Sequence, residues 1–198
     1  MSTDEAEWLE KARRGDELAF AQIVEAYQRP VYNLCYRMLG DGYEAEDAAQ
    51  ETFLRAYKYL KRYDPNRSFA TWLLSIASHH CIDIIRKRRM RLVPIEALPG
   101  ETLPDPGITP ETAVRIGEDQ QAVQALLQEL SPTDRSAVIL YYWYEYSYEE
   151  IAEALSLTVS AVKSRLHRAR KALGAAWQTK KAESESALKR KRHESPAF

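Results

Sequence analysis

Hydrophobic residues recur every three or four positions along most of this chain, which is the spacing of one face of an α-helix. In the N-terminal part this spacing covers four stretches, at residues 3–15, 17–39, 43–60 and 68–89. Glycines end the first two stretches, and Pro30 is expected to kink or divide the second. The pattern predicts an all-helical domain over residues 1–91.

The periodicity is lost between residues 92 and 117, where prolines and acidic residues accumulate. The prolines are Pro94, Pro99, Pro104, Pro106 and Pro110. This composition predicts an extended, flexible linker. Helical spacing returns at 118–130 and 133–144, so a second small all-α domain is expected over residues 118–177.

Residues 146–173 predict a helix-turn-helix. Ser147 and Glu150 form a capping-box pattern at the start of a short helix, and Thr158 is placed to cap a second helix from Val159 to about Ala176. The second helix has an apolar face and an opposite polar face made of Ser160, Lys163, Ser164, His167, Arg168 and Lys171. Cations neutralise phosphates and donate to guanine edges, so the polar face is a candidate for the major groove. An ordinary solvated face is the alternative.

The helix expected at 43–60 has an unusual outward face. Leu54 stands where solvent is expected, and polar residues surround it at helical spacing, namely Asp47, Gln50, Glu51 and Lys58. No cation is obviously placed to pair with Asp47 and Glu51. An apolar anchor with a polar rim is typical of a protein interface, although a single exposed leucine is also common on ordinary surfaces.

The helix expected at 68–89 is amphipathic and ends in a run of cations. Its buried stripe contains Phe69, Trp72, Leu73, Ile76, Ala77 and Ile84, and a polar stripe contains Thr71, Ser75, Ser78, His79 and Arg86. The polar stripe suits a nucleic-acid backbone, with exposed aromatic residues of the preceding loop available for base stacking, and it equally suits solvent. Consecutive residues point about 100° apart on a helix, so His79, His80 and Cys81 cannot close one metal site.

Charge and composition refine this picture. The 28 basic and 29 acidic residues nearly cancel, so any affinity for nucleic acid must come from local clusters. One such cluster lies in residues 178–198, where apolar residues are few and a disordered basic tail is expected. The chain shows no apolar run of signal-peptide or membrane-spanning type, which predicts a cytoplasmic protein without membrane insertion. Cys35 and Cys81 form no CxxC motif and are expected to be buried, reduced thiols.

Three motifs carry a resemblance to a known family. They are AEDAAQETFLRAYKYL at 45–60, FATWLLSIASHHCIDIIRKRR at 69–89 and SYEEIAEALSLTVSAVKSRLHRARKAL at 147–173. In order and spacing they are similar to the extracytoplasmic-function (ECF) sigma factors of bacterial RNA polymerase, over about residues 8 to 177. The resemblance implies a factor that binds core RNA polymerase and directs transcription initiation, with no enzymatic activity, cofactor, metal or small-molecule substrate.

The resemblance also implies a division of roles. Residues 1–91 resemble sigma region 2, which would bind the clamp coiled coil of the large polymerase subunit through Asp47, Gln50, Glu51 and Leu54. The same region would melt and hold the minus-10 element through Tyr63, Asn66, Phe69, Trp72, Ser75, His79 and Arg86. Residues 118–177 resemble region 4, which would read the minus-35 duplex through the polar helix face defined above. The implied partners are the polymerase clamp and flap, promoter DNA and an anti-sigma factor.

The chain departs from the family pattern at three positions. His79 stands where the family usually has Asn, and Glu145 and Ser160 replace commonly seen glycines. The alternative function is a stand-alone helix-turn-helix transcriptional regulator, which would leave the outward face around Leu54 without a role. The chain contains no Gly-rich phosphate loop, HExxH pair or nucleophile elbow, which argues against an enzyme.

Overall fold

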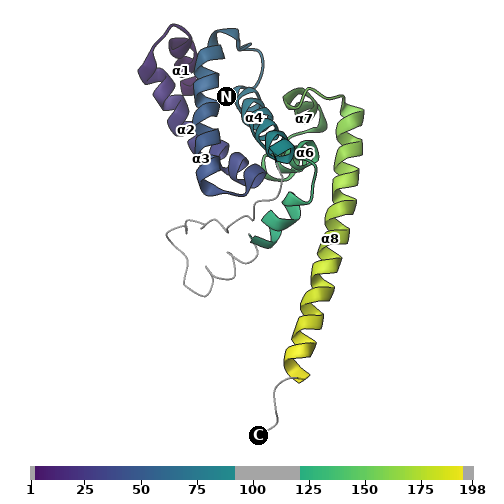
Figure 1. Cartoon of the computed structure of the whole chain (residues 1–198). Helices are drawn as coiled ribbons and strands as arrows, with labels where there is room; N and C mark the ends of the chain where they lie inside the picture. The colour runs from purple at the N-terminus through teal and green to yellow at the C-terminus, as the bar shows by residue number, and fades with distance from the viewer. Residues whose placement is uncertain (1–2, 92–120, 194–198) are drawn as a thin grey trace.

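The computed structural model describes the backbone of residues 3–91 and 121–193 and the side chains of residues 4–90 and 121–179. The fold is all-α, as predicted, and Figure 1 shows its helices. The predicted linker at 92–117 and the expected helix start at 118–120 lie outside the described residues. We call residues 3–91 the N-terminal half and residues 121–193 the C-terminal half.

The N-terminal half is built around one long helix. Its elements are α1 (Thr3–Arg13), α2 (Glu17–Leu39), α3 (Gly42–Tyr59), a 3₁₀ turn (Leu60–Arg62) and α4 (Phe69–Arg91). Asp16 caps the N-terminus of α2, and Gly40 ends it in the left-handed conformation that glycine adopts without strain. α2 packs against α1, α3 and α4. Pro30 does not divide α2, which is one continuous helix.

The C-terminal half consists of a helix at 121–128, α6 (Pro132–Trp143), α7 (Tyr148–Ala154) and α8 (Val159–His193). The predicted capping box is present, because Ser147 Oγ accepts from the Glu150 amide while the Glu150 carboxylate accepts from the Ser147 amide. Thr158 Oγ1 accepts from the Ala161 amide and caps α8. The prediction that α8 ends near Ala176 is wrong, since the helix continues to His193 and projects beyond the other helices (Figure 1). Residues 194–198 of the tail that was expected to be disordered lie outside the described residues.

The two halves pack against each other. α6 lies on α2 and α4, and α7 lies on α4. Arg135 of α6 is only 2% exposed and donates from Nη1 to the Met38 carbonyl of α2 at 2.5 Å and to Gln128 Oε1 at 2.7 Å. Tyr144 donates its hydroxyl hydrogen to the Pro30 carbonyl at 2.5 Å. The bonds to Met38 and Pro30 join residues 97 and 114 positions apart.

Cys35 and Cys81 are buried free thiols, as predicted. In the described part of the chain, no helix combines the length and the apolar character needed to span a membrane. The same residues contain no group of three or more His, Cys, Asp or Glu side chains arranged to hold a metal ion.

Candidate nucleic-acid and polymerase interfaces

The basic face of α8 is exposed and faces away from the core. Val162, Leu166 and Ala169 are buried on the opposite side of the helix. The six residues predicted to contact DNA, Ser160, Lys163, Ser164, His167, Arg168 and Lys171, are all exposed. α8 packs only against α6 and α7 among the element pairs with several contacts in the described chain. One face of α8 is therefore fixed on the domain and the other is accessible to a large ligand.

The orientation of α8 is set by contacts with the two preceding helices. Arg165 Nη1 lies 2.8 Å from Asp134 Oδ1, and this partly buried ion pair joins α8 to α6. Asp134 also accepts from the Ser131 hydroxyl at the N-terminus of α6. Lys163 Nζ lies 5.6 Å from the ring centroid of Tyr148, so a residue of α7 supports one of the predicted DNA contacts through a cation–π interaction.

Both departures from the family's glycine pattern in this half have a defined geometry. Glu145 keeps a left-handed backbone, with φ of 55°, although it is not glycine. Ser156, in the turn between α7 and α8, has φ of 54°. Ser160 lies inside the first turn of α8, where no special φ is required. The turns therefore persist without glycine, at the cost of strain at Glu145 and Ser156.

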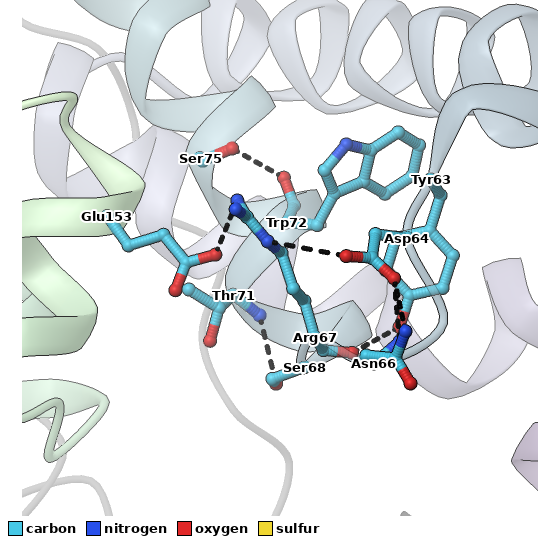
Figure 2. Close-up of polar contacts among 9 residues, drawn as sticks. All are labelled: Tyr63, Asp64, Asn66, Arg67, Ser68, Thr71, Trp72, Ser75 and Glu153. Carbon is cyan, nitrogen blue, oxygen red and sulfur yellow. Dashed lines mark hydrogen bonds and ion pairs between the residues drawn. The ribbon is translucent and has the colours of Figure 1, made fainter.

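The loop before α4 is held by its own polar contacts (Figure 2). Asp64 Oδ1 accepts from the Asn66 amide and from Asn66 Nδ2, both at 3.0 Å. The Tyr63 hydroxyl donates to the Arg67 carbonyl at 2.5 Å, and Ser68 Oγ accepts from the Thr71 amide. Asp64, Asn66 and Arg67 remain exposed. The loop thus presents polar side chains from a fixed backbone.

Aromatic rings anchor this loop from below. The ring of Tyr63 packs edge-on against that of Phe69, with 5.3 Å between ring centroids, and its centroid lies 5.2 Å from that of Trp72. The ring of Phe69 also packs edge-on against Tyr27 of α2, with 5.4 Å between centroids. Tyr63 is buried, so the expectation of exposed loop aromatics is wrong for this residue, whereas Phe69 is buried as predicted. Trp72 is half-buried. Burial also raises the pKa of the Tyr63 hydroxyl.

The polar stripe predicted along α4 is interrupted. Thr71 and Ser78 are buried, which contradicts their predicted place on an open polar surface. His79 and Arg86 are exposed, and His79 Nδ1 lies 2.8 Å from the Ser75 carbonyl oxygen. The Ser75 hydroxyl donates to the Trp72 carbonyl at 2.7 Å. Within the described residues, Ser75, His79 and Arg86 are the part of the stripe that a ligand can reach.

The outward face of α3 is confirmed as exposed, but one of its charged side chains has an ion-pair partner within the helix. Leu54 is 66% exposed. Glu51 Oε1 lies 2.6 Å from Arg55 Nε, so the expectation that Glu51 has no intramolecular partner is wrong. The Arg55 hydrogen bond also lowers the pKa of Glu51. Asp47 and Gln50 are exposed, and no ion pair of Asp47 is found within the described chain.

Comparisons with known proteins identify the family. Residues 23–91 match the family model for Sigma-70 region 2, and residues 120–173 match that for Sigma-70 region 4. The ECF RNA polymerase sigma factor SigW of Bacillus subtilis is 40% identical over 176 residues, which cover 83% of this chain and 92% of SigW. The chain belongs to the ECF sigma factors of RNA polymerase.

Other relatives agree with this membership. The RNA polymerase sigma-H factor of Pseudomonas aeruginosa is 33% identical over 177 residues, covering 86% of this chain and 92% of that protein. The solved structure of CnrH in complex with the cytosolic domain of CnrY superposes with a TM-score of 0.67 at 25% identity, over 89% of this chain and 99% of CnrH. Members of the family are transcription initiation factors, which bind RNA polymerase and direct initiation at promoters, and they are not catalytic enzymes.

In this sigma factor the structure adds two residues that the sequence did not single out. The ring of Tyr148 contacts the ammonium group of Lys163, and these residues are 15 positions apart, a separation that does not place two residues on one helix face by local spacing. Arg67 lies in the loop before α4 and reaches Glu153 of the C-terminal half, with 3.0 Å between Nη1 and Oε1 (Figure 2). Neither contact could be predicted from local spacing, because each depends on how separate elements pack.

Proposed function

We propose that this ECF sigma factor reads the minus-35 duplex with α8 and holds the melted minus-10 strand with the loop at 63–68 and α4. Family membership already implies polymerase binding and promoter-directed initiation. The finer assignment rests on the exposed polar groups of the two halves. The stand-alone regulator is less well supported, because it gives no role to the exposed face of α3.

The minus-35 role is supported by the chemistry of the α8 face. Arg168 and Lys163 carry donors long enough for the O6 and N7 atoms of guanine, and Ser160, Ser164 and His167 can bond to base edges or phosphates. Lys171 lies one turn further along and suits a phosphate. The domain places these residues on a helix fixed by the Asp134–Arg165 pair, which is the arrangement that a major-groove contact requires.

The minus-10 role is supported by the exposed groups around the loop. Asn66, His79 and Arg86 are accessible to a single strand, and half-buried Trp72 and Ser75 lie beside them along the chain. Tyr63 and Phe69 belong to this site as buried supports of the loop and do not stack on a base in this conformation. A rigid loop carrying hydrogen-bonding groups suits an unstacked base, and the cations suit its phosphates.

The polymerase role is supported by the exposed face of α3. Leu54 supplies an apolar anchor, and Asp47, Gln50 and Glu51 supply the polar rim. The exposed side chain of Asp47 is available to a cation of the clamp coiled coil, whereas Glu51 would have to exchange or share Arg55. This face, on the same chain as the recognition helix, is the single observation that favours a polymerase-bound factor over a stand-alone regulator.

Run-off transcription with core RNA polymerase tests the proposal. The purified chain should confer specific initiation on core enzyme without any other sigma factor, whereas a regulator would need one already present. Asp47→Ala combined with Leu54→Ala should reduce core binding at least tenfold, measured by co-purification and titration, while the fold is retained. Glu25→Ala, which removes an exposed carboxylate from α2, is the control. Unchanged core binding by the double variant would contradict the α3 interface.

We further propose that a second protein, an anti-sigma factor, binds this chain. Support comes from CnrH, which at 25% identity was solved with the cytosolic domain of CnrY bound. A pull-down from the native host with the tagged chain, followed by mass spectrometry, should recover such a partner together with core polymerase subunits. Recovery of polymerase subunits alone would count against an anti-sigma factor.

A further inference from the structure

The ion pair between Arg67 and Glu153 joins the two proposed DNA sites. Arg67 Nη1 lies 3.0 Å from Glu153 Oε1, and Arg67 Nε lies 3.8 Å from Asp64 Oδ2 (Figure 2). Arg67 comes from the loop of the proposed minus-10 site, and Glu153 comes from α7, the first helix of the helix-turn-helix. The side chains are 60% and 45% exposed, so water and ions can reach both groups.

The loop backbone holds Arg67 in place independently of Glu153. The Arg67 amide donates to the Asp64 carbonyl at 3.1 Å, and its carbonyl accepts from the Tyr63 hydroxyl. Asn66, its neighbour, is fixed by two bonds to Asp64. A guanidinium presented from an ordered loop suits bidentate recognition of a phosphate. The Glu153 carboxylate carries the same charge as a phosphodiester and, like it, offers two oxygens to a guanidinium.

The packed arrangement of the halves is incompatible with reading both promoter elements at once. The minus-35 and minus-10 elements are about 25 base pairs apart, which is about 85 Å of duplex at about 3.4 Å per base pair. Glu153 precedes Val159, the first residue of α8, by six positions, which span at most roughly 21 Å. Arg67 therefore lies within roughly 25 Å of the recognition helix, and the halves must separate before both elements are bound.

We propose that Arg67 binds a backbone phosphate of the melted minus-10 strand and that Glu153 occupies this site while the two halves are packed together. The proposal rests on the proposed function. Separation of the halves removes Glu153 from the loop, so the same movement that spaces the two DNA-binding sites also frees Arg67. Premature capture of single-stranded nucleic acid by the free sigma factor is thereby reduced.

The test uses the purified full-length chain without polymerase and a fluorescein-labelled oligothymidylate of about ten nucleotides as the probe, because a phosphate contact does not depend on base sequence. Glu153→Gln should tighten binding about two- to fivefold, the range expected for loss of an exposed ion pair. Glu149→Gln is the matched control, since Glu149 is exposed on the same helix and has the same charge. It should leave the affinity unchanged.

Arg67→Ala should weaken binding and reduce the dependence of log affinity on log salt by about 0.7, the value for one single-strand phosphate. In the Arg67→Ala background, Glu153→Gln should not increase the affinity for the oligothymidylate. Equal gains from Glu149→Gln and Glu153→Gln, a gain that persists without Arg67, or absence of probe binding by every variant would each overturn the proposal. Run-off transcription by the parent chain reports on the proposed function separately, so the two failures are distinguishable.

Discussion

At the scale of single residues, backbone strain is concentrated at the entrance and turn of the helix-turn-helix. Glu145 and Ser156 have left-handed φ values in a conformation that disfavours a Cβ atom. Glu145 is exposed and lies between α6 and α7, where the Tyr146 amide donates a hydrogen bond to the Leu140 carbonyl of α6. The left-handed residue therefore belongs to the connection that lets α7 fold back, and its side chain is not needed for packing.

Glu145→Gly should stabilise the protein by about 0.5 to 1 kcal/mol. The left-handed conformation costs a residue with a Cβ atom about 1–2 kcal/mol, and the greater entropy of glycine in the unfolded chain offsets part of the gain. Urea denaturation followed by circular dichroism measures the change. Glu149→Gly is the control, because Glu149 lies in the first turn of α7, where glycine relieves no strain and should cost up to about 1 kcal/mol. A loss of stability in both variants would contradict the strain at Glu145.

At the scale of elements, local signals in the sequence were sufficient to predict where a helix begins when a side chain at that end caps it. Ser147 with Glu150 and Thr158 predicted the starts of α7 and α8, because a capping side chain and the amide it accepts from are within three residues. Such signals did not predict the burial of Thr71, which depends on neighbours distant in sequence. The length of α8 was also missed, since its polar C-terminal part has no apolar periodicity.

The recognition helix gives a prediction that separates base contacts from phosphate contacts. Arg168→Ala should change the minus-35 base preference, because a good base contact contributes about 1–3 kcal/mol of discrimination. Lys171→Ala should weaken binding to all minus-35 sequences alike and reduce the slope of log affinity against log salt by about one. Transcription from a promoter library with each holoenzyme, at several salt concentrations, measures both effects. A changed base preference only in Lys171→Ala would show that α8 is rotated on the DNA relative to this assignment.

At the scale of the whole molecule, the packed halves share a buried cation. Burial lowers the pKa of Arg135 to about 10, with smaller effects from Arg89 and Arg88, so the guanidinium remains charged at neutral pH. The guanidinium donates to oxygens of Met38, Gln128 and Leu130, and no carboxylate pairs with it among the described residues. Most of these bonds lie within the C-terminal half. Separation of the halves must break the bond to Met38, the bond of Tyr144 to Pro30 and the Arg67–Glu153 ion pair. It must also break the two bonds that Gln124 Nε2 donates to the Tyr36 and Arg37 carbonyls.

Tyr144→Phe should favour the separated arrangement without unfolding either half. The substitution keeps the ring and removes the hydroxyl that donates to the Pro30 carbonyl. A typical hydrogen bond contributes about 1 kcal/mol net, so the ratio of separated to packed molecules should rise about fivefold. Single-molecule energy transfer between dyes on Glu25→Cys in α2 and Gln178→Cys in α8 measures this ratio, because both positions are exposed and the native thiols are buried. Tyr142→Phe, at an exposed ring two residues earlier, is the matched control. If both tyrosine variants leave the ratio at the parent value, the Tyr144 bond does not hold the halves together.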